Sequence, residues 1–432
     1  MDIIKALSDR NLLGAAFPDL GTWGPWLTAL RAAYGLPLAE GELGLYQQAT
    51  GRETPPGAPA REVYLICGRR AGKSRIAAAI AVYEALFPQV KLAPGEVGTV
   101  ALLAVDRDTA RVLLEYIRHV IEASPILRRM VSESLAQEIR LKNRRVIQVM
   151  TASAASVRGR TYLACVLDEL AFFRNSEGLA NDAEVVRALR PGLATTGGKL
   201  VGLSSPYARS GLLWEVYRRY YGQEGDVLVW QAPTLTMNPT LNPELIARDL
   251  EADPEAARSE WEAEFRSDLE TFLPGEAIEA VVIPCRFELP PQAGVSYVAF
   301  VDPSGGRGDA AALALAHVEG DRVVLDLARS WPAPHNPQSV IREMAEALRA
   351  YGVRRVTGDR YAGDWPRQEF MKHQIAYDPA PQDKSRIYLD FLPLVLSGRC
   401  ELLDLKRLTN ELRDLVRRPR SGQGPGGPSP AW

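Results

Sequence analysis

A short glycine-containing segment near residue 70 carries residue types that bind phosphate. It reads CGRRAGKS and lies between an apolar run, Val63–Cys67, and a stretch of helical periodicity, Arg75–Phe87. A loop that opens a helix directs backbone N–H groups and the helix dipole at an anion. Lys73 is placed to reach the β- and γ-phosphates of ATP, and Ser74 to ligate Mg²⁺. The predicted contacts to the nucleotide come from Gly68, Arg69, Arg70, Gly72, Lys73 and Ser74.

A pair of adjacent carboxylates supports this interpretation. The loop alone is an imperfect match to GxxxxGK[ST], because Cys67 stands where the first glycine belongs and Gly68 comes one position late. About 95 residues downstream, however, an apolar strand ends in Asp168 and Glu169. At the end of a strand, Asp168 can hold Mg²⁺ while Glu169 turns towards an attacking water, which is the division of labour in ATP hydrolysis. Together the two segments predict an ATPase.

Two further segments could contribute to the nucleotide site. Ser204 and Ser205 directly follow the predicted strand Lys199–Leu203, at the sheet edge where ligands of open α/β sheets bind. They could sense the γ-phosphate, and a simple Ser-Pro turn explains them equally well. Upstream, Gln48 in the run Tyr46–Gln48 could contact the adenine by its amide.

Arginines just before the second strand suggest a contribution from a neighbouring subunit. In Ser156–Arg160, one arginine could act in trans as a finger on the phosphates, and Arg158 is favoured over Arg160. The alternatives are that the arginine contacts a DNA phosphate or is an ordinary surface residue. Another basic segment, Arg140–Met150, reads as a hairpin with a turn at 142–143, and we expect its arginines to face DNA.

A second group of carboxylates lies in the last third of the chain. Asp302 ends one predicted strand, Asp309 precedes the next, and Asp359 ends a later one. Carboxylates from adjacent strand ends can bind one or two Mg²⁺ or Mn²⁺ ions, which stabilise the attacking and leaving oxygens in phosphodiester cleavage. A turn or a cap is the ordinary alternative for any single Asp. The surrounding β–β–β–α–β order fits a ribonuclease H-like fold.

The elements that must position these groups divide the chain into parts. From Glu62 to about Pro206, short apolar strands alternate with helical stretches, which is typical of a P-loop α/β domain with a mostly parallel sheet. A turn-rich break, Met237–Pro243, precedes a charged helical connector. We predict an ATPase domain with an N-terminal extension over 1–240 and a helical linker or lid region over 241–285. A ribonuclease H-like α/β nuclease domain follows over 286–418, and a Gly/Pro-rich disordered tail over 419–432.

Composition excludes several classes of protein. The 432 residues carry 51 Lys+Arg against 53 Asp+Glu, a net charge of −2, with 46% hydrophobic residues, as in a soluble globular protein. Four widely spaced cysteines indicate neither zinc nor a disulfide framework. No apolar run is long enough for a membrane span, and no secretion signal is evident. Eight of the basic residues are Lys, and the remaining 43 are Arg, which suits phosphate recognition but equally a GC-rich genome.

With both groups in view, the chain resembles the large subunit of tailed-phage terminases from about Gln47 to Arg417. The resemblance rests on GRRAGKS, on VRG ahead of VLDE, on SSP after the next strand, and on EWEAEFRSDLETFL at Glu260–Leu273. VDPSGGRGD, GDRYAG at Gly358–Gly363 and DKSRIYLDFLPLVLSGRCELLD add to it. The combination is specific, although each piece is weak alone.

The resemblance implies an ATP-driven motor that pumps double-stranded DNA into a procapsid, with a metal-dependent nuclease that cuts the concatemer. It implies a portal protein and a small terminase subunit as partners, a homo-oligomeric ring on the procapsid, and a location in the bacterial host cytoplasm rather than in a membrane. The residues that carry over to the nucleotide site are Lys73, Ser74, Asp168 and Glu169, with Ser204 and Ser205 as coupling residues. Those that carry over to the nuclease metals are Asp302 and Asp359, with Asp309 as an auxiliary ligand.

One departure from the family pattern affects the nuclease. The pattern ends in a third acidic motif after the helix that resembles Leu402–Arg418, whereas this chain has no Asp or Glu after Asp414. We expect the second metal to bind weakly and cutting to be impaired, unless Asp404 or Asp414 substitutes. Two other functions stay open: a transposase- or resolvase-type nuclease switched by ATP, and an inactive prophage remnant that only binds DNA or portal.

Overall fold

The protein forms two compact units, one up to Leu269 and one from Glu270 onwards. The computed structural model describes residues 1–152, 156–173, 182–267, 269–307, 309–359 and 365–417. The predicted tail 419–432 and most of the GDRYAG segment lie outside these residues. Within the described residues, no helix combines the length and the apolar character that a membrane span requires.

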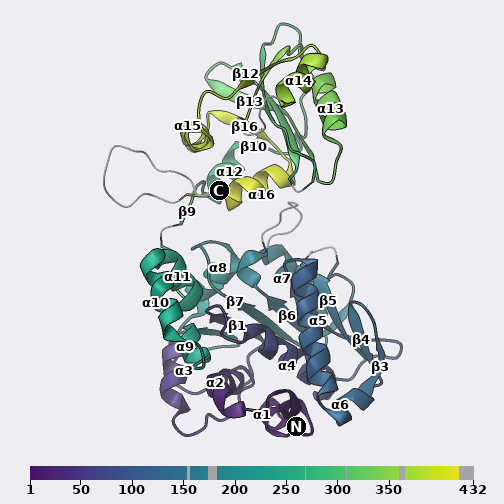
Figure 1. The fold of residues 1–432 in the computed structure, drawn as a ribbon, viewed down its shortest axis with the longest axis vertical. Coiled ribbons are helices and arrows are strands. Elements are labelled where there is room, and N and C mark those ends of the chain that lie inside the picture. The colour runs from purple at the N-terminus through teal and green to yellow at the C-terminus, as the bar shows by residue number, and fades with distance from the viewer. Residues whose placement is uncertain (153–155, 174–181, 268, 308, 360–364, 418–432) are drawn as a thin grey trace. The chain divides into compact units, whose positions relative to one another are not determined.

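The first unit is built on an eight-stranded sheet whose order is β3-β4-β5-β2-β6-β7-β1-β8 (Figure 1). In this order, all neighbouring strands from β5 across to β8 pair in parallel, and the two antiparallel pairings are β3 with β4 and β4 with β5. The predicted mostly parallel sheet is therefore confirmed. The strands are β1 (Glu62–Cys67), β2 (Gly98–Ala104), β3 (Val131–Ser134), β4 (Glu138–Leu141), β5 (Arg145–Thr151), β6 (Thr161–Asp168), β7 (Lys199–Ser204) and β8 (Val227–Ala232).

Helices cover both faces of this sheet, because its central strands are apolar on both sides. One face packs against α4 (Lys73–Leu86), α5 (Arg107–Glu122) and the N-terminal helices, the other against α7 (Asp182–Ala194) and α8 (Gly211–Tyr220). The remaining helices are α1 (Ile3–Ser8), α2 (Gly24–Ala33), α3 (Glu42–Thr50), α6 (Pro125–Met130), α9 (Thr234–Met237), α10 (Pro243–Ala252) and α11 (Pro254–Trp261). Helices α10 and α11, from the predicted connector, belong to this unit.

The second unit has a seven-stranded sheet of order β10-β16-β13-β12-β11-β14-β15. Strands β11, β12 and β13 form an antiparallel meander, after which α13 crosses over to β14, which pairs parallel with β11. This is the predicted β–β–β–α–β order. The strands are β10 (Val282–Ile283), β11 (Tyr297–Asp302), β12 (Ala311–Glu319), β13 (Arg322–Trp331), β14 (Arg355–Gly358), β15 (Ala376–Pro379) and β16 (Cys400–Leu403).

Helices again bury the apolar side chains of this sheet. The apolar residues of α13 (Pro337–Ala350) pack with Val301, Leu313 and Leu315 of the central strands. A separate cluster joins α12 (Gly275–Val281), α15 (Lys384–Leu396) and α16 (Lys406–Asp414) to the β16 edge. The other elements are α14 (Trp365–Lys372) and the short antiparallel pair of β9 (Glu270–Thr271) with β17 (Val416–Arg417). The C-terminal ends of the paired strands β11 and β14 therefore lie side by side.

Candidate nucleotide and metal sites

The phosphate loop connects β1 to α4, and Gly68 is the position in it that requires a glycine. Cys67 is the last residue of β1 and is fully buried, and burial raises the pKa of its thiol to about 12. A Cβ on Gly68 would lie 2.1 Å from Thr234 Oγ1 and 2.7 Å from the carbonyl oxygen of Trp261. Residue 68 must therefore lack a side chain, whereas residue 67 is a strand position that fills the core.

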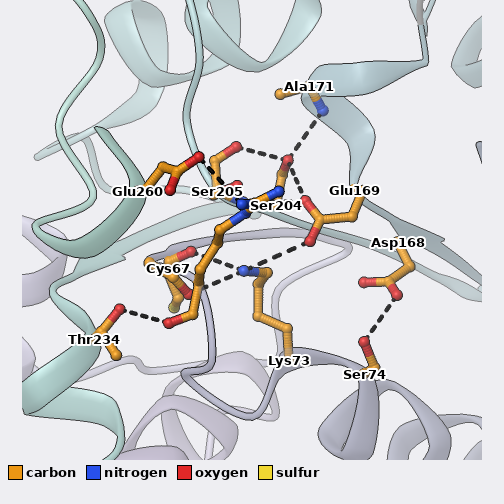
Figure 2. Close-up of polar contacts among 12 residues, drawn as sticks. Cys67, Lys73, Ser74, Asp168, Glu169, Ala171, Ser204, Ser205, Thr234 and Glu260 are labelled. Atoms are coloured by element: carbon orange, nitrogen blue, oxygen red, sulfur yellow. Dashed lines mark hydrogen bonds and ion pairs between the residues drawn. The ribbon is translucent and has the colours of Figure 1, made fainter. Parts of the chain in front are cut away.

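Lys73 and Ser74 begin α4 directly beneath Asp168, the last residue of β6, and Glu169, which follows it (Figure 2). Lys73 is only 5% exposed, and its ammonium donates to the carbonyl oxygens of Cys67 at 3.1 Å and Gly68 at 3.0 Å. The same nitrogen lies 3.7 Å from the Glu169 carboxylate. The Ser74 hydroxyl donates to Asp168 at 3.0 Å. The structure thus brings together two pairs of adjacent residues that lie about 95 positions apart in the sequence.

Asp168 offers a buried acceptor that the described residues do not use. Its Oδ1 is buried and has no hydrogen-bond partner among them. Burial, together with the charge of Glu169, raises the pKa of Asp168 to about 6. A carboxylate oxygen without a donor, beside a serine hydroxyl, is the type of oxygen ligand that Mg²⁺ prefers. The residues present therefore fit a divalent cation.

Glu169 is turned out of the strand by an unusual backbone conformation. Its φ is +56°, in the left-handed region that costs a residue with a side chain free energy. Its Oε2 accepts hydrogen bonds from the Ser204 hydroxyl at 3.3 Å and from the Ser205 backbone N–H at 3.4 Å. Figure 2 shows both serines beside this carboxylate. The end of β7 therefore contacts Glu169 directly.

A cavity of about 690 Å³ opens over the phosphate loop. Aromatic residues of the N-terminal extension form part of its wall, a contribution that no spacing in the sequence indicated. Trp23 lines the cavity, its ring would lie 3.0 Å from a Cβ on Gly72, and Arg75 lies over that ring at 5.0 Å. The buried indole of Trp26 donates to the carbonyl oxygen of Ala71 at 2.7 Å. The remaining lining residues include Thr22, Arg69, Arg70, Tyr116, Met237, Asn238, Thr240 and Trp261.

The opposite wall of the loop is held by α9 and α11. The Arg69 backbone N–H donates to the carbonyl oxygen of Glu260 at 2.5 Å, and their side chains form an ion pair at 3.2 Å. Thr234 donates to the carbonyl oxygen of Arg69 at 2.8 Å, and Asn238 to that of Arg70 at 2.9 Å. The segment that follows β8 is thereby part of the nucleotide site.

Six of the predicted residues do not line this cavity: Gly68, Asp168, Ser204 and Ser205 contact residues that do, whereas Gln48 and Arg158 show no such contact within the described residues. Gln48 is exposed on α3, and its backbone carbonyl accepts a hydrogen bond from Tyr221 at 3.0 Å. Arg158 is exposed in the turn before β6. Neither is among the described residues that line the cavity.

In the second unit, Asp302 is the last residue of β11 and Asp359 directly follows β14. The register Val301↔Gly358 makes the two residues neighbours. Partial burial raises the pKa of Asp302, and the negative charges of Asp359 and Asp309 raise it further. Three carboxylates that repel one another at a sheet edge match the donor chemistry of a hard cation. Among the described residues, however, no three His, Cys, Asp or Glu side chains are arranged to hold one metal ion.

The two candidate substitutes for a third acidic ligand have different positions. Asp404 follows β16, three strands from β11, and about 14 Å therefore separates the strands. Its carboxylate accepts a hydrogen bond from the Cys285 backbone N–H at 3.0 Å. Asp414 ends α16, and its side chain lies outside the described residues.

Residues 58–194 match the family described as terminase large subunit, ATPase domain. This confirms the predicted resemblance in the segment that holds the phosphate loop and the paired carboxylates. The large terminase of bacteriophage HK97 is similar in structure, at 15% identity, 95% coverage of both chains and a TM-score of 0.42. The large terminase ATPase domain of Thermus phage P74-26 is 18% identical, covering 55% of this chain and 97% of that one, with a TM-score of 0.40.

The large terminase nuclease of thermophilic phage G20c is 14% identical, covering 34% of this chain and 82% of that one, with a TM-score of 0.30. Among curated proteins, none matches this chain.

Proposed function

From the match of residues 58–194 to the terminase ATPase domain family, we propose that this protein is an ATP-driven motor that translocates double-stranded viral DNA into a procapsid. One observation supports the proposal most directly: Lys73, Ser74, Asp168 and Glu169 converge at one sheet edge within that segment. These are the groups that a nucleotide hydrolase needs for phosphate binding, metal binding and positioning of water.

Each residue has a separate task in the proposed hydrolysis. The Lys73 ammonium exchanges the carbonyl oxygens of Cys67 and Gly68 for the β- and γ-phosphates. Ser74 and Asp168 would hold Mg²⁺, which, when bound, supplies positive charge against the phosphate oxygens. Glu169 orients the attacking water and accepts its proton.

Ser204 and Ser205 are suited to couple the state of this site to the rest of the unit. They contact the Glu169 carboxylate, so any turn of that carboxylate towards water changes their hydrogen bonds. We infer that Arg158 acts on the phosphates of an adjacent subunit in a homo-oligomeric ring. The portal, the small terminase subunit and a bacterial cytoplasmic location belong to the same proposal.

The second unit is proposed to cut concatemeric DNA as a metal-dependent endonuclease. Asp302 and Asp359 would hold Mg²⁺ or Mn²⁺, with Asp309 as an auxiliary ligand, and the metal would stabilise charge on the phosphodiester oxygens. Because the described residues gather few ligands there, we expect a second ion to bind weakly. Cutting should then be slow.

The nucleotide assignment is tested with Glu169→Gln. This change keeps the shape of the side chain but removes the group that accepts the proton, so DNA-stimulated ATP hydrolysis should fall at least a hundredfold while a fluorescent ATP analogue still binds. Lys73→Ala should instead lose binding. The control is Glu215→Gln, the same change at an exposed position on α8.

Turnover of Glu169→Gln at the level of the control would contradict the assignment. Filling of procapsids with DNA in the presence of ATP then distinguishes a packaging motor from an ATP-switched nuclease of transposase or resolvase type.

A further inference from the structure

A second cavity of the first unit, of about 570 Å³, lies between α5 and the β4–β5 hairpin. Figure 1 shows α5 beside these strands. Three arginines line it: Arg107 and Arg111 from the first turns of α5, and Arg160 from the loop before β6. None of its described lining residues is a carboxylate. We call the surface formed by Arg107, Arg111, Arg160 and Gln148 the basic groove.

The arginines of the basic groove are almost free of protein partners. Arg107 and Arg160 make no side-chain hydrogen bond or ion pair within the described part of the chain. Arg111 reaches only Asp108, at 3.5 Å, and both side chains are at least 75% exposed. An ion pair of that kind contributes little. Three guanidinium groups therefore face solvent with their donors available.

The hairpin arginines, which the sequence suggested for DNA, have protein partners; Arg144 is exposed and donates to the carbonyl oxygen of Glu96 at 3.2 Å. Arg145 is only 8% exposed and donates to two carbonyl oxygens: that of Ala85, in the last turn of α4, and that of Pro88, just beyond the helix. Arg140 is paired with Glu133 and Glu138. The expectation that Arg145 faces DNA is therefore wrong, because its charge is used to satisfy carbonyl oxygens at a helix C-terminus.

A neighbouring cavity of about 670 Å³ shares Arg160 and Gln148 with the basic groove, and its lining adds Arg140 and Arg144 together with Glu96 and Glu138. Adjacent cavities that both carry arginines suit a polymer of phosphates better than a single anion. Guanidinium groups bind phosphate oxygens through pairs of parallel hydrogen bonds. We propose that the basic groove binds the phosphodiester backbone of double-stranded DNA. This inference rests on the proposed function, and it names where on the ATPase the DNA lies.

Helix α5 connects this groove to the nucleotide cavity. Arg107 and Arg111 line the groove, while Tyr116, on the same helix, lines the nucleotide cavity. Five residues of helix, about 7.5 Å of rise, separate Arg111 from Tyr116. A rigid element that touches both ligands gives DNA a direct way to alter ATP turnover. The groove also distinguishes two arginines that are close in sequence, because Arg160 lines it and Arg158 does not.

The test uses the double variant Arg107→Gln/Arg160→Gln and a labelled random-sequence duplex. Each phosphate contact adds about 0.9 to the slope of log K against log salt. Losing two contacts should therefore reduce the slope by about 1.8, so that the ratio of variant to wild-type Kd falls about twelvefold between 50 and 200 mM salt. Basal ATPase activity and melting temperature should stay unchanged. The matched control is Arg129→Gln, an exposed arginine on α6 that lines neither cavity.

Three other results of this experiment would contradict the groove, the proposed function or both. A double variant with the wild-type slope, while wild-type protein binds the duplex, would overturn the groove and leave the motor intact. Loss of affinity for a fluorescent ATP analogue with unchanged DNA binding would assign the groove to nucleotide instead and overturn the inference. Wild-type protein that binds no duplex at low salt would overturn both the groove and the proposed function.

Discussion

Trp26 links the N-terminal extension to the phosphate loop through one hydrogen bond. Its indole is fully buried and donates to the carbonyl oxygen of Ala71. Because a peptide unit is planar and trans, fixing that carbonyl also fixes the direction of the Gly72 N–H. A residue far upstream thereby helps to set the geometry that phosphate oxygens meet.

We predict that Trp26→Phe raises the KM for ATP more than it lowers kcat. The change leaves a buried carbonyl without its donor, at a cost of about 1–3 kcal/mol, part of which appears in the unfolding free energy. Steady-state kinetics measure the change in KM, and thermal melting measures the loss of stability. The control is Trp230→Phe, because the indole nitrogen of Trp230 is equally buried but has no hydrogen-bond partner among the described residues. Equal KM values in the two variants would contradict a positioning role.

At the scale of elements, the arrangement of β1, the loop and α4 explains why the GxxxxGK[ST] motif places its first glycine at the wrong residue in this chain. The strand runs one residue further than GxxxxGK[ST] allows, so Cys67 belongs to the core and the loop starts at Gly68. Helix α4 then begins at Lys73 after Gly72, whose φ of +101° suits glycine. The phosphate contacts depend on the position of the loop between these elements rather than on a glycine at residue 67.

Cys67→Gly, which restores the motif, should therefore harm the protein. It removes a buried side chain and adds backbone freedom to a central strand, so we expect the unfolding free energy to fall by about 1–3 kcal/mol without a gain in ATPase activity. Gly68→Ala is the contrasting change, since its Cβ would collide with backbone and with Thr234, and it should abolish ATP binding. A more active Cys67→Gly enzyme would show that the glycine is needed.

At the scale of the whole molecule, the two candidate sites belong to separate compact units, each with its own sheet and core. The nucleotide site uses residues before Leu269, and the carboxylate pair uses residues after it. Chemistry at one site should therefore be removable without loss of the fold at the other.

Asp302→Asn should abolish Mn²⁺-dependent plasmid cleavage and weaken Mn²⁺ binding in calorimetry, while ATP hydrolysis is unchanged. The charge that is lost stands beside Asp359 at the paired strand ends. Asp404→Asn provides the comparison, because Asp404 lies three strands away and should leave cleavage unaffected. If cleavage survives in Asp302→Asn but not in Asp404→Asn, the metal site lies elsewhere on the sheet.

The alternation of strands and helices up to β7 and the β–β–β–α–β order of the second unit could be predicted from the sequence, because hydrophobic periodicity and turn residues are local properties. The same holds for the end of β6 at Asp168, since a buried apolar run that stops at two charges marks its own boundary. For the second unit, the order of elements together with carboxylates at strand ends was enough to place Asp302 and Asp359 on neighbouring strands.

Tertiary structure decided what depends on contacts between distant segments. Trp23 and Trp26 enter the nucleotide site only because the N-terminal extension packs on α4, and no local pattern records that packing. Arg145 and Arg160 look alike in sequence, but one is buried against the end of α4 and the other lies free in the basic groove. A side chain's charge is visible in the sequence, whereas its burial and its partners, which determine what that charge can bind, arise only from the fold.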